Sequence, residues 1–184
     1  MTAARRAWAA DLLHFWFHEL RPEDWFRPDP RLDAALGRRF ARWLAALRPR
    51  PAGEFLTDPA TALAAVLLFD QLPRNLHRGS PLAFATDPLA RAIARAALAR
   101  DWDRSLGRAE RQFLAMPLMH SESIADQRAS IAYFAALGLP QPFAFARAHH
   151  RMIARFDRFP HRNEALGRHS TAPERAAVAA GFAW

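Results

Sequence analysis

The sequence contains no cysteine and no lysine, and it has few residues that favour β-strands. The absence of cysteine excludes a disulfide scaffold, a thiolate metal site and a cysteine nucleophile. Valine, isoleucine and threonine together supply only 11 of the 184 residues, whereas alanine alone supplies 41. Because alanine is the strongest helix former and β-branched residues populate strands, this composition predicts an all-α protein.

Long apolar runs and glycine-rich loops are also missing. The longest apolar run, residues 59–69, is about half of the roughly 20 residues that a membrane-spanning helix requires. Asp11 interrupts the N-terminal stretch before the apolar region of a signal peptide is complete. The seven glycines are scattered singly, so we find no phosphate-cradling or dinucleotide-binding loop. We therefore expect a cytoplasmic protein with no membrane partner and no cofactor.

The positive charge of the chain comes from arginine alone. All 26 basic residues are arginine, and the formal net charge is +8. A protein that binds nucleic acid concentrates its basic residues in a stripe interleaved with aromatic side chains, but here the arginines are spread evenly along the chain. We interpret them as solvated helix faces and expect no nucleic-acid partner.

Apolar spacing and proline positions both indicate helices. Leu36, Phe40, Trp43 and Leu47 follow helical steps of three and four. Several prolines follow a side chain that can cap a helix, which is a favourable arrangement at a helix start. These pairs are Asp29–Pro30, Asp58–Pro59, Ser80–Pro81 and Asp87–Pro88. Thr171 and Glu174 have the spacing of a capping box.

Residues 1–184 are predicted to form one all-α domain of helices in antiparallel pairs. The predicted helices cover residues 3–20, 30–48, 59–72, 88–101, 108–116, 122–137, 142–157 and 172–182. No linker long enough to divide the chain separates them, and no sequence repeat of fixed period is present.

A first group of polar residues stands at the end of the helix predicted over residues 59–72. This helix is apolar on nearly every side, so we expect it to be central and buried. The group consists of Asp70, Gln71, Arg74 and Asn75. Asp70 falls on a core-facing side, and burying a carboxylate without a partner costs several kcal/mol. We expect Arg74 or Arg78 to pair with it.

A second group follows residue 119. Ser121 is a plausible N-cap, and Glu122 and Asp126 are four residues apart, so both carboxylates are predicted to share one helix face. His120 lies beside them. The spacing matches no His-Glu-x-x-His or comparable ligand pattern, so we expect no metal site.

A third group is rich in hydrogen-bond donors. It consists of Arg158, His161, Arg162, Asn163 and Arg168, with His149 and His150 just before it. His149 lies on an apolar helix stripe, where histidine is usually a structural core residue. The arginines are suited to holding an anion, and they also complement the carboxylates of the first two groups.

These three groups carry a resemblance to a known family. The chain resembles the uncharacterised bacterial family called domain of unknown function 924. The matching segments are residues 15–17, 67–75, 84–88, 116–122, 159–163, 166–168 and 170–171. The resemblance implies a domain of about eight antiparallel helices, similar to a tetratricopeptide-like superhelix but without the 34-residue repeat. It implies no activity.

The chain departs from the family pattern in three places. Asp157 stands where the family has glycine, Ser123 stands where an acidic residue is usual, and residues 175–179 lack the expected aromatic and leucine anchors. We expect the carboxylate of Asp157 to weaken anion binding by the donors that follow it.

Three functional hypotheses remain open from the sequence. The first is a binding module for a small anionic molecule or a peptide terminus, held where the three groups converge. The second is a hydrolase or lyase with His120 or His150 as general base, Asp70 or Glu122 as orienting carboxylate, and Arg162 as charge stabiliser. The third is a buried polar network with a structural role. Oligomeric state stays open.

Overall fold

The computed structural model describes residues 6–182, and within that range the regular elements are all helical. The α-helices are α1 (Ala7–His14), α2 (Pro30–Leu47), α3 (Pro59–Val66), α4 (Leu72–Leu76), α5 (Asp87–Leu98), α6 (Arg108–Met119), α7 (Ile124–Leu137), α8 (Pro140–Phe156) and α9 (Ala172–Ala179). Short 3-10 turns are η3 (Pro22–Asp24), η4 (Ala52–Phe55), η6 (Pro81–Ala83), η7 (Trp102–Ser105) and η8 (Pro160–Arg162), and π-helical turns are η2 (Phe15–Glu19) and η5 (Leu67–Gln71). The predicted all-α class is confirmed.

The predicted helices are present, and several of their boundaries differ from the prediction. The helix expected at 3–20 begins at Ala7 and becomes π-helical at Phe15, while residues 3–5 lie outside the described part of the chain. The helix expected at 108–116 continues to Met119, and the one expected at 172–182 ends at Ala179. The helix expected at 142–157 begins two residues earlier, at Pro140.

Capping side chains begin several helices as their sequence predicts. The carboxylate of Asp58 accepts the Thr61 N–H at 2.9 Å. The pair at Asp87 is an exception, because α5 begins at Asp87 itself and Thr86 occupies the N-cap position. Asp87 was therefore wrongly interpreted as a cap, and its carboxylate is available to bind Arg74 instead.

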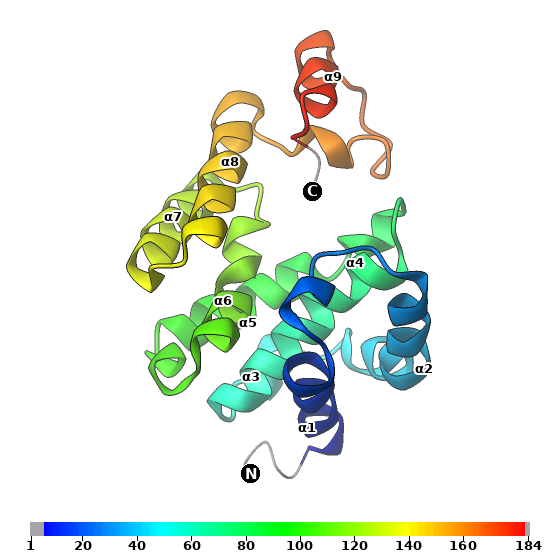
Figure 1. Cartoon of the computed structure of the whole chain (residues 1–184), viewed down its shortest axis with the longest axis vertical. Helices are drawn as coiled ribbons and strands as arrows, with labels where there is room; N and C mark the ends of the chain where they lie inside the picture. Colours follow the sequence, from blue (N-terminus) through cyan, green and yellow to red (C-terminus); the bar gives the residue numbers. More distant parts are fainter. Residues whose placement is uncertain (1–5, 183–184) are drawn as a thin grey trace.

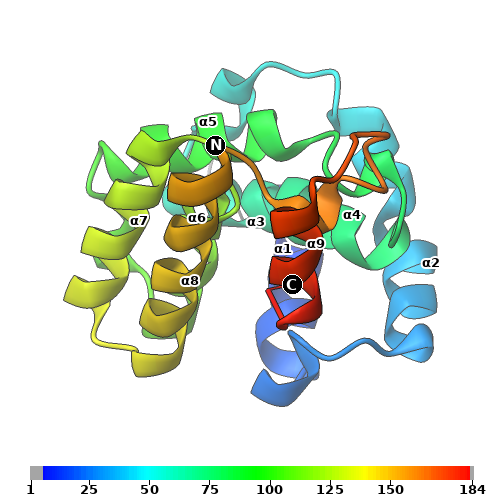
Figure 2. The same cartoon turned by 90° about the horizontal axis from the view of Figure 1, so that it is seen from above.

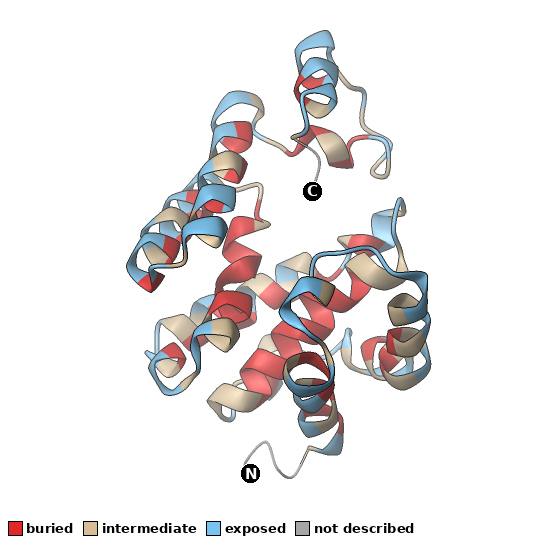
Figure 3. Cartoon of the chain, viewed as in Figure 1, coloured by how far each residue is buried: buried red, intermediate tan, exposed pale blue. Residues whose placement is uncertain are grey.

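A continuous buried helix formed by α3, η5 and α4 lies at the centre of the molecule (Figures 1 and 3). Helices α1, α5 and α6 pack against α3, and α2 packs against α4. Helices α7 and α8 form an antiparallel pair that contacts α6. The predicted central, apolar helix is thus confirmed, and its burial stabilises the fold through the hydrophobic effect.

This central helix does not end at residue 72 as predicted. It passes through the π-turn η5 and continues to Leu76. Pro73 cannot donate a backbone hydrogen bond and would crowd the carbonyl of Phe69 in a regular α-helix. The wider π-turn avoids this conflict, and the hydroxyl of Thr86 donates to the freed Phe69 carbonyl at 2.6 Å.

Figures 1 and 2 show that the C-terminal segment, residues 157–182, leaves the end of α8 and extends toward α4. A small apolar cluster of its own, including Phe159 and Ala177, packs on Met152 and Ile153 of α8. Within residues 6–182 no helix is both long and apolar enough to cross a membrane. The tetratricopeptide-like arrangement and the single-domain organisation stay predictions.

Asp157, which ends α8, has a left-handed backbone with φ 55°. Glycine adopts this region without the steric cost that a Cβ brings. We therefore expect Asp157→Gly to raise the free energy of unfolding by roughly 0.5–1 kcal/mol, since relief of strain outweighs the greater flexibility of the unfolded chain. Urea denaturation would measure this. The matched control is Arg155→Gly inside α8, expected to destabilise by about 1 kcal/mol, and destabilisation by Asp157→Gly would contradict the prediction.

Candidate functional site

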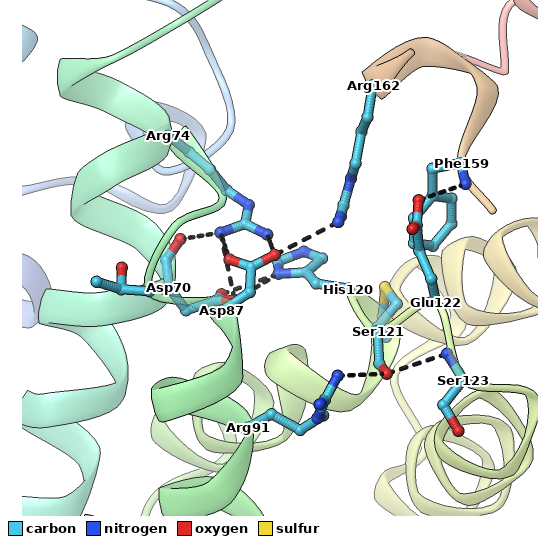
Figure 4. A network of polar contacts seen from close by, with 12 residues as sticks. Asp70, Arg74, Asp87, Arg91, His120, Ser121, Glu122, Ser123, Phe159 and Arg162 are labelled. Carbon is cyan, nitrogen blue, oxygen red and sulfur yellow. Dashed lines mark hydrogen bonds and ion pairs between the residues drawn. The ribbon is translucent and has the colours of Figure 1, made fainter. Parts of the chain in front are cut away.

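Asp70 lies in a buried polar network at the π-turn of the central helix (Figure 4). Its carboxylate oxygens lie 2.8 and 2.9 Å from Nδ1 of His120, and the amide of Gln71 donates to it at 2.5 Å. Arg74 lies 3.4 Å away. Burial opposes ionisation of Asp70, but Arg74 and His120 outweigh it and hold the pKa of the carboxyl below its usual range. Of the two partners predicted, Arg74 is therefore confirmed and Arg78 is not.

A second carboxylate, Asp87, connects two arginines from distant parts of the chain. Arg74 donates two parallel hydrogen bonds to it, at 2.8 and 2.9 Å. Arg162 donates a longer one, at 3.4 Å. The guanidinium of Arg162 lies over two aromatic rings, 4.6 Å from the centroid of Phe84 and 4.5 Å from that of Phe159. Such cation–π contacts partly replace the water that burial removes.

Aromatic contacts connect Arg162 back to His120. The ring of Phe159 lies 5.3 Å from that of His149, and His149 lies 6.2 Å from His120, measured between centroids. Together with the polar contacts described above, these aromatic contacts connect the residues into a closed ring, which we call the Asp70–Arg162 cluster. Its members are Asp70, Arg74, Asp87, His120, His149, Phe159 and Arg162. Side chains that are up to 92 positions apart in the sequence thus meet at one place.

Glu122 attaches the C-terminal segment next to this cluster. Its carboxylate accepts the backbone N–H of Phe159 at 2.8 Å and two hydrogen bonds from Arg168, at 2.8 and 3.0 Å. Arg168 also donates to the Phe159 carbonyl at 3.1 Å. Burial opposes ionisation of Glu122, but Arg168 and the Phe159 N–H outweigh it and lower the pKa of this carboxyl. Glu122 therefore positions Phe159.

Glu122 and Asp126 do not share a helix face, and this prediction is wrong. Helix α7 begins at Ile124 after Ser123, so Glu122 lies in the preceding loop. Ser121 is not the N-cap. Its hydroxyl donates to Asp126 at 2.7 Å and accepts the Ser123 N–H at 3.1 Å. The carboxylate of Asp126 pairs instead with Arg95 of α5.

Two donors of the third group hold the C-terminal segment together. Arg158 pairs with Glu174 at the start of α9, with Nε 2.6 Å from the carboxylate. The side-chain amide of Asn163, which is fully buried, donates to the hydroxyl of Ser170 at 3.1 Å. Both residues lie outside the Asp70–Arg162 cluster, although the sequence placed them with Arg162.

The two neighbouring histidines of α8 have different surroundings. His149 is buried and its Nδ1 lies 2.8 Å from the carbonyl of Phe145. The side chain of His150 has no hydrogen bond, ion pair or ring contact with another residue in the part of the chain that the structure describes. His161 lies against Phe159, with ring centroids 5.6 Å apart. Asn75 donates to the carbonyl of Gln71 at 3.1 Å and lies at the edge of the site.

Burial keeps the histidines around the cluster neutral at pH 7. It lowers the pKa of His149 to about 3, assisted by His120, and that of His161 to about 3, assisted by Arg162. It also lowers the pKa of His120, against the opposing effect of Asp70. Burial and the neighbouring Arg74 lower the pKa of Arg162 to about 10. The guanidinium therefore stays charged at neutral pH, and the neighbouring carboxylates do not fully offset the cost of burying its charge.

Four residues of the site were missed in the sequence or given another role. Asp87 has the pattern of a helix cap, and His149 that of a core histidine. Phe84 and Phe159 stand in the family motifs but carry no titratable group. The sequence held one signal for Asp87. If Arg74 and further arginines are buried near Asp70, that single carboxylate cannot pair with all of them, so another acidic residue must lie close by.

Within the described residues no cluster of metal-binding side chains is present, and two surface grooves lie away from the Asp70–Arg162 cluster. No group of three or more His, Asp or Glu side chains within residues 6–182 is arranged to bind a metal. One groove, of about 300 Å³, lies between Phe145 of α8 and Phe182. Another, of about 390 Å³, lies beside Arg95 and Tyr133.

Comparisons with known proteins give a family and no activity. Residues 12–181 match the family described as bacterial protein of unknown function, DUF924. A search of curated proteins found no match. A solved structure, the protein of unknown function ATU0120 from Agrobacterium tumefaciens, is 36% identical with a TM-score of 0.90, and the alignment covers 96% of this chain and 99% of that one. The chain belongs to the DUF924 family, as its motifs predict.

Proposed function

We propose that this chain is a helical binding module that holds a small anionic group, such as a phosphate or a carboxylate of a small molecule or peptide terminus, at Arg162. The observation that carries the proposal is the incomplete pairing of this arginine. Its side chain is 7% exposed, and within residues 6–182 its one hydrogen bond is the 3.4 Å contact to Asp87. Its Nε is buried and has no hydrogen-bond partner among the same residues.

An anionic oxygen would supply what this guanidinium lacks. A guanidinium carries five N–H donors in a planar fork that matches carboxylate and phosphate. Leaving such donors unpaired in a buried place costs free energy, which a ligand can recover on binding. Because Arg162 is shielded from water, its attraction to an anion would be stronger there than in bulk water.

A purely structural network is the second candidate function, and a specific observation favours it. The carboxylates of the cluster already have partners, since Asp70 and Asp87 are both bound by Arg74. Glu122 is likewise bound by Arg168. On this hypothesis the contacts only fix the packing of α4, α6 and the C-terminal segment.

Thermal unfolding in the presence of anions separates the two candidates. We expect inorganic phosphate or succinate to raise the midpoint of the wild-type protein by roughly 5–10 °C at 100 times the dissociation constant, because binding then adds about 2.7 kcal/mol. Sodium chloride at equal ionic strength is the reference. We expect Arg162→Gln to lose this increase.

The matched control is Arg158→Gln, in the same segment but paired with Glu174. It should keep the anion-dependent increase even if its own midpoint is lower. Phosphate also stabilises proteins by exclusion from their surface, so the difference between wild type and Arg162→Gln is the deciding quantity. Equal increases in both would exclude the binding site and favour the structural network.

A further inference from the structure

His120 presents one ring nitrogen to a buried carboxylate, and within the described residues the other ring nitrogen has no hydrogen-bond partner. Its Nδ1 lies 2.8 Å from the nearer oxygen of Asp70. Because Asp70 is ionised and accepts only, Nδ1 must carry the proton, and the lone pair of the neutral imidazole is then on Nε2. Within residues 6–182 this Nε2 forms no hydrogen bond, and the side chain retains 11% exposure.

The orientation of the His120 imidazole is fixed by the residues that hold Asp70 at its Nδ1. Asp70 is held by Gln71 at 2.5 Å and by Arg74 at 3.4 Å, and it has no exposed surface. His120 itself ends helix α6, where the backbone N–H of residue 120 bonds the Met116 carbonyl at 3.0 Å. A buried carboxylate at Nδ1 orients the general-base histidine of hydrolytic triads in the same way.

His120 and Arg162 belong to one closed set of contacts. They are connected through His149 and Phe159 on one side, and through the two carboxylates and Arg74 on the other. A molecule whose anionic end binds Arg162 would therefore occupy the same cluster as the imidazole of His120.

We propose that His120 is the general base of a hydrolytic site for esters that carry an anionic group. The inference rests on the proposed function, because Arg162 holds the anionic group and thereby positions the ester. Asp70 is a positioning residue in this scheme, since it acts on substrate only through His120.

The reaction uses water as the nucleophile. Nε2 of His120 takes one proton from a water molecule as the water oxygen forms a bond to the acyl carbon. The bond between the acyl carbon and the leaving-group oxygen then breaks, and that oxygen receives the proton from Nε2. The products are a carboxylic acid and an alcohol, and the histidine returns to its neutral form.

Two polar side chains next to His120 in the sequence already have hydrogen-bond partners. The hydroxyl of Ser121 donates to Asp126 and accepts from Arg91 at 3.2 Å, so it is not available as a nucleophile. Glu122 is bound by Arg168 and by the Phe159 N–H. These contacts leave His120 as the base and water as the nucleophile.

Two chromogenic esters test the inference, p-nitrophenyl hemisuccinate with a carboxylate and p-nitrophenyl acetate without one. After subtraction of the spontaneous rates, we expect the wild-type protein to hydrolyse the hemisuccinate at least about 10-fold faster than the acetate. His120→Gln should lower the hemisuccinate rate by about 100-fold or more, as loss of a general base does. Arg162→Gln should abolish the preference between the esters. His14→Gln, which removes an exposed histidine, should change neither rate.

A second measurement does not depend on the folding of a variant. Nitrogen NMR of the His120 ring in the wild-type protein should show the proton on Nδ1, and a proton on Nε2 at neutral pH would overturn the inference. An unchanged hemisuccinate rate in His120→Gln, or no rate above background in the wild type, would also overturn it. In either case a retained phosphate-dependent increase in midpoint would leave the proposed function in place, whereas loss of both would reject both.

Discussion

Replacement of Asp70 by alanine should lower the free energy of unfolding by about 3 kcal/mol, the lower end of the 3–5 kcal/mol that removal of one partner from a buried ion pair costs. The carboxylate is fully buried and bonds to His120 and Gln71, which would lose their partner. The loss stays near the lower end because Arg74 keeps its two hydrogen bonds to Asp87. Urea denaturation at pH 7.5 is the measurement.

Two further variants test whether this loss of stability comes from the burial and the charge of Asp70. Asp33→Ala breaks the comparable but more exposed pair with Arg78 and should cost no more than about 1 kcal/mol. Asp70→Asn keeps the volume of the side chain and removes only its charge, so it separates electrostatics from packing. If Asp70→Ala cost no more than Asp33→Ala, the cluster would not be a determinant of stability.

The stability of the protein should fall steeply on acidification, beginning near pH 6.5. His149 and His161 have folded-state pKa values of about 3, well below the unfolded value of about 6.5. Below pH 6.5 the unfolded chain therefore binds protons that the folded protein does not, so the free energy of unfolding decreases as pH falls. Each such histidine contributes up to about 1.4 kcal/mol per pH unit between pH 6.5 and pH 3.

Urea denaturation at intervals from pH 7.5 to pH 4 would measure this slope. The carboxylates with lowered pKa, Asp70 and Glu122, lose their contribution only at more acidic pH, so the histidines dominate between pH 6.5 and 5. His149→Gln should flatten the profile in that window, whereas His14→Gln, at an exposed histidine, should not. A stability that is constant from pH 7.5 to 5 would contradict the burial of neutral imidazoles.

Asp70 and Asp87, the two ion-paired carboxylates of the cluster, show what local sequence patterns can predict and what they cannot. Asp70 could be recognised because it stands in the most apolar helix of the chain, where an unpaired charge is costly. Asp87 could not, because a carboxylate before a proline has the same local pattern whether it caps its own helix or binds Arg74. Only the packing of α4 beside η6 and the start of α5 distinguishes the two.

The sequence by itself determined the helical class, the central buried helix, most helix starts and the family, since composition, apolar period and capping act within a few residues. The tertiary structure decided which polar residues meet. It turned His149 rather than His150 toward the cluster and separated Glu122 from Asp126. Small shifts in where a helix begins, and the extra residue of a π-turn, rotate a side chain to another face, and these depend on packing between distant segments.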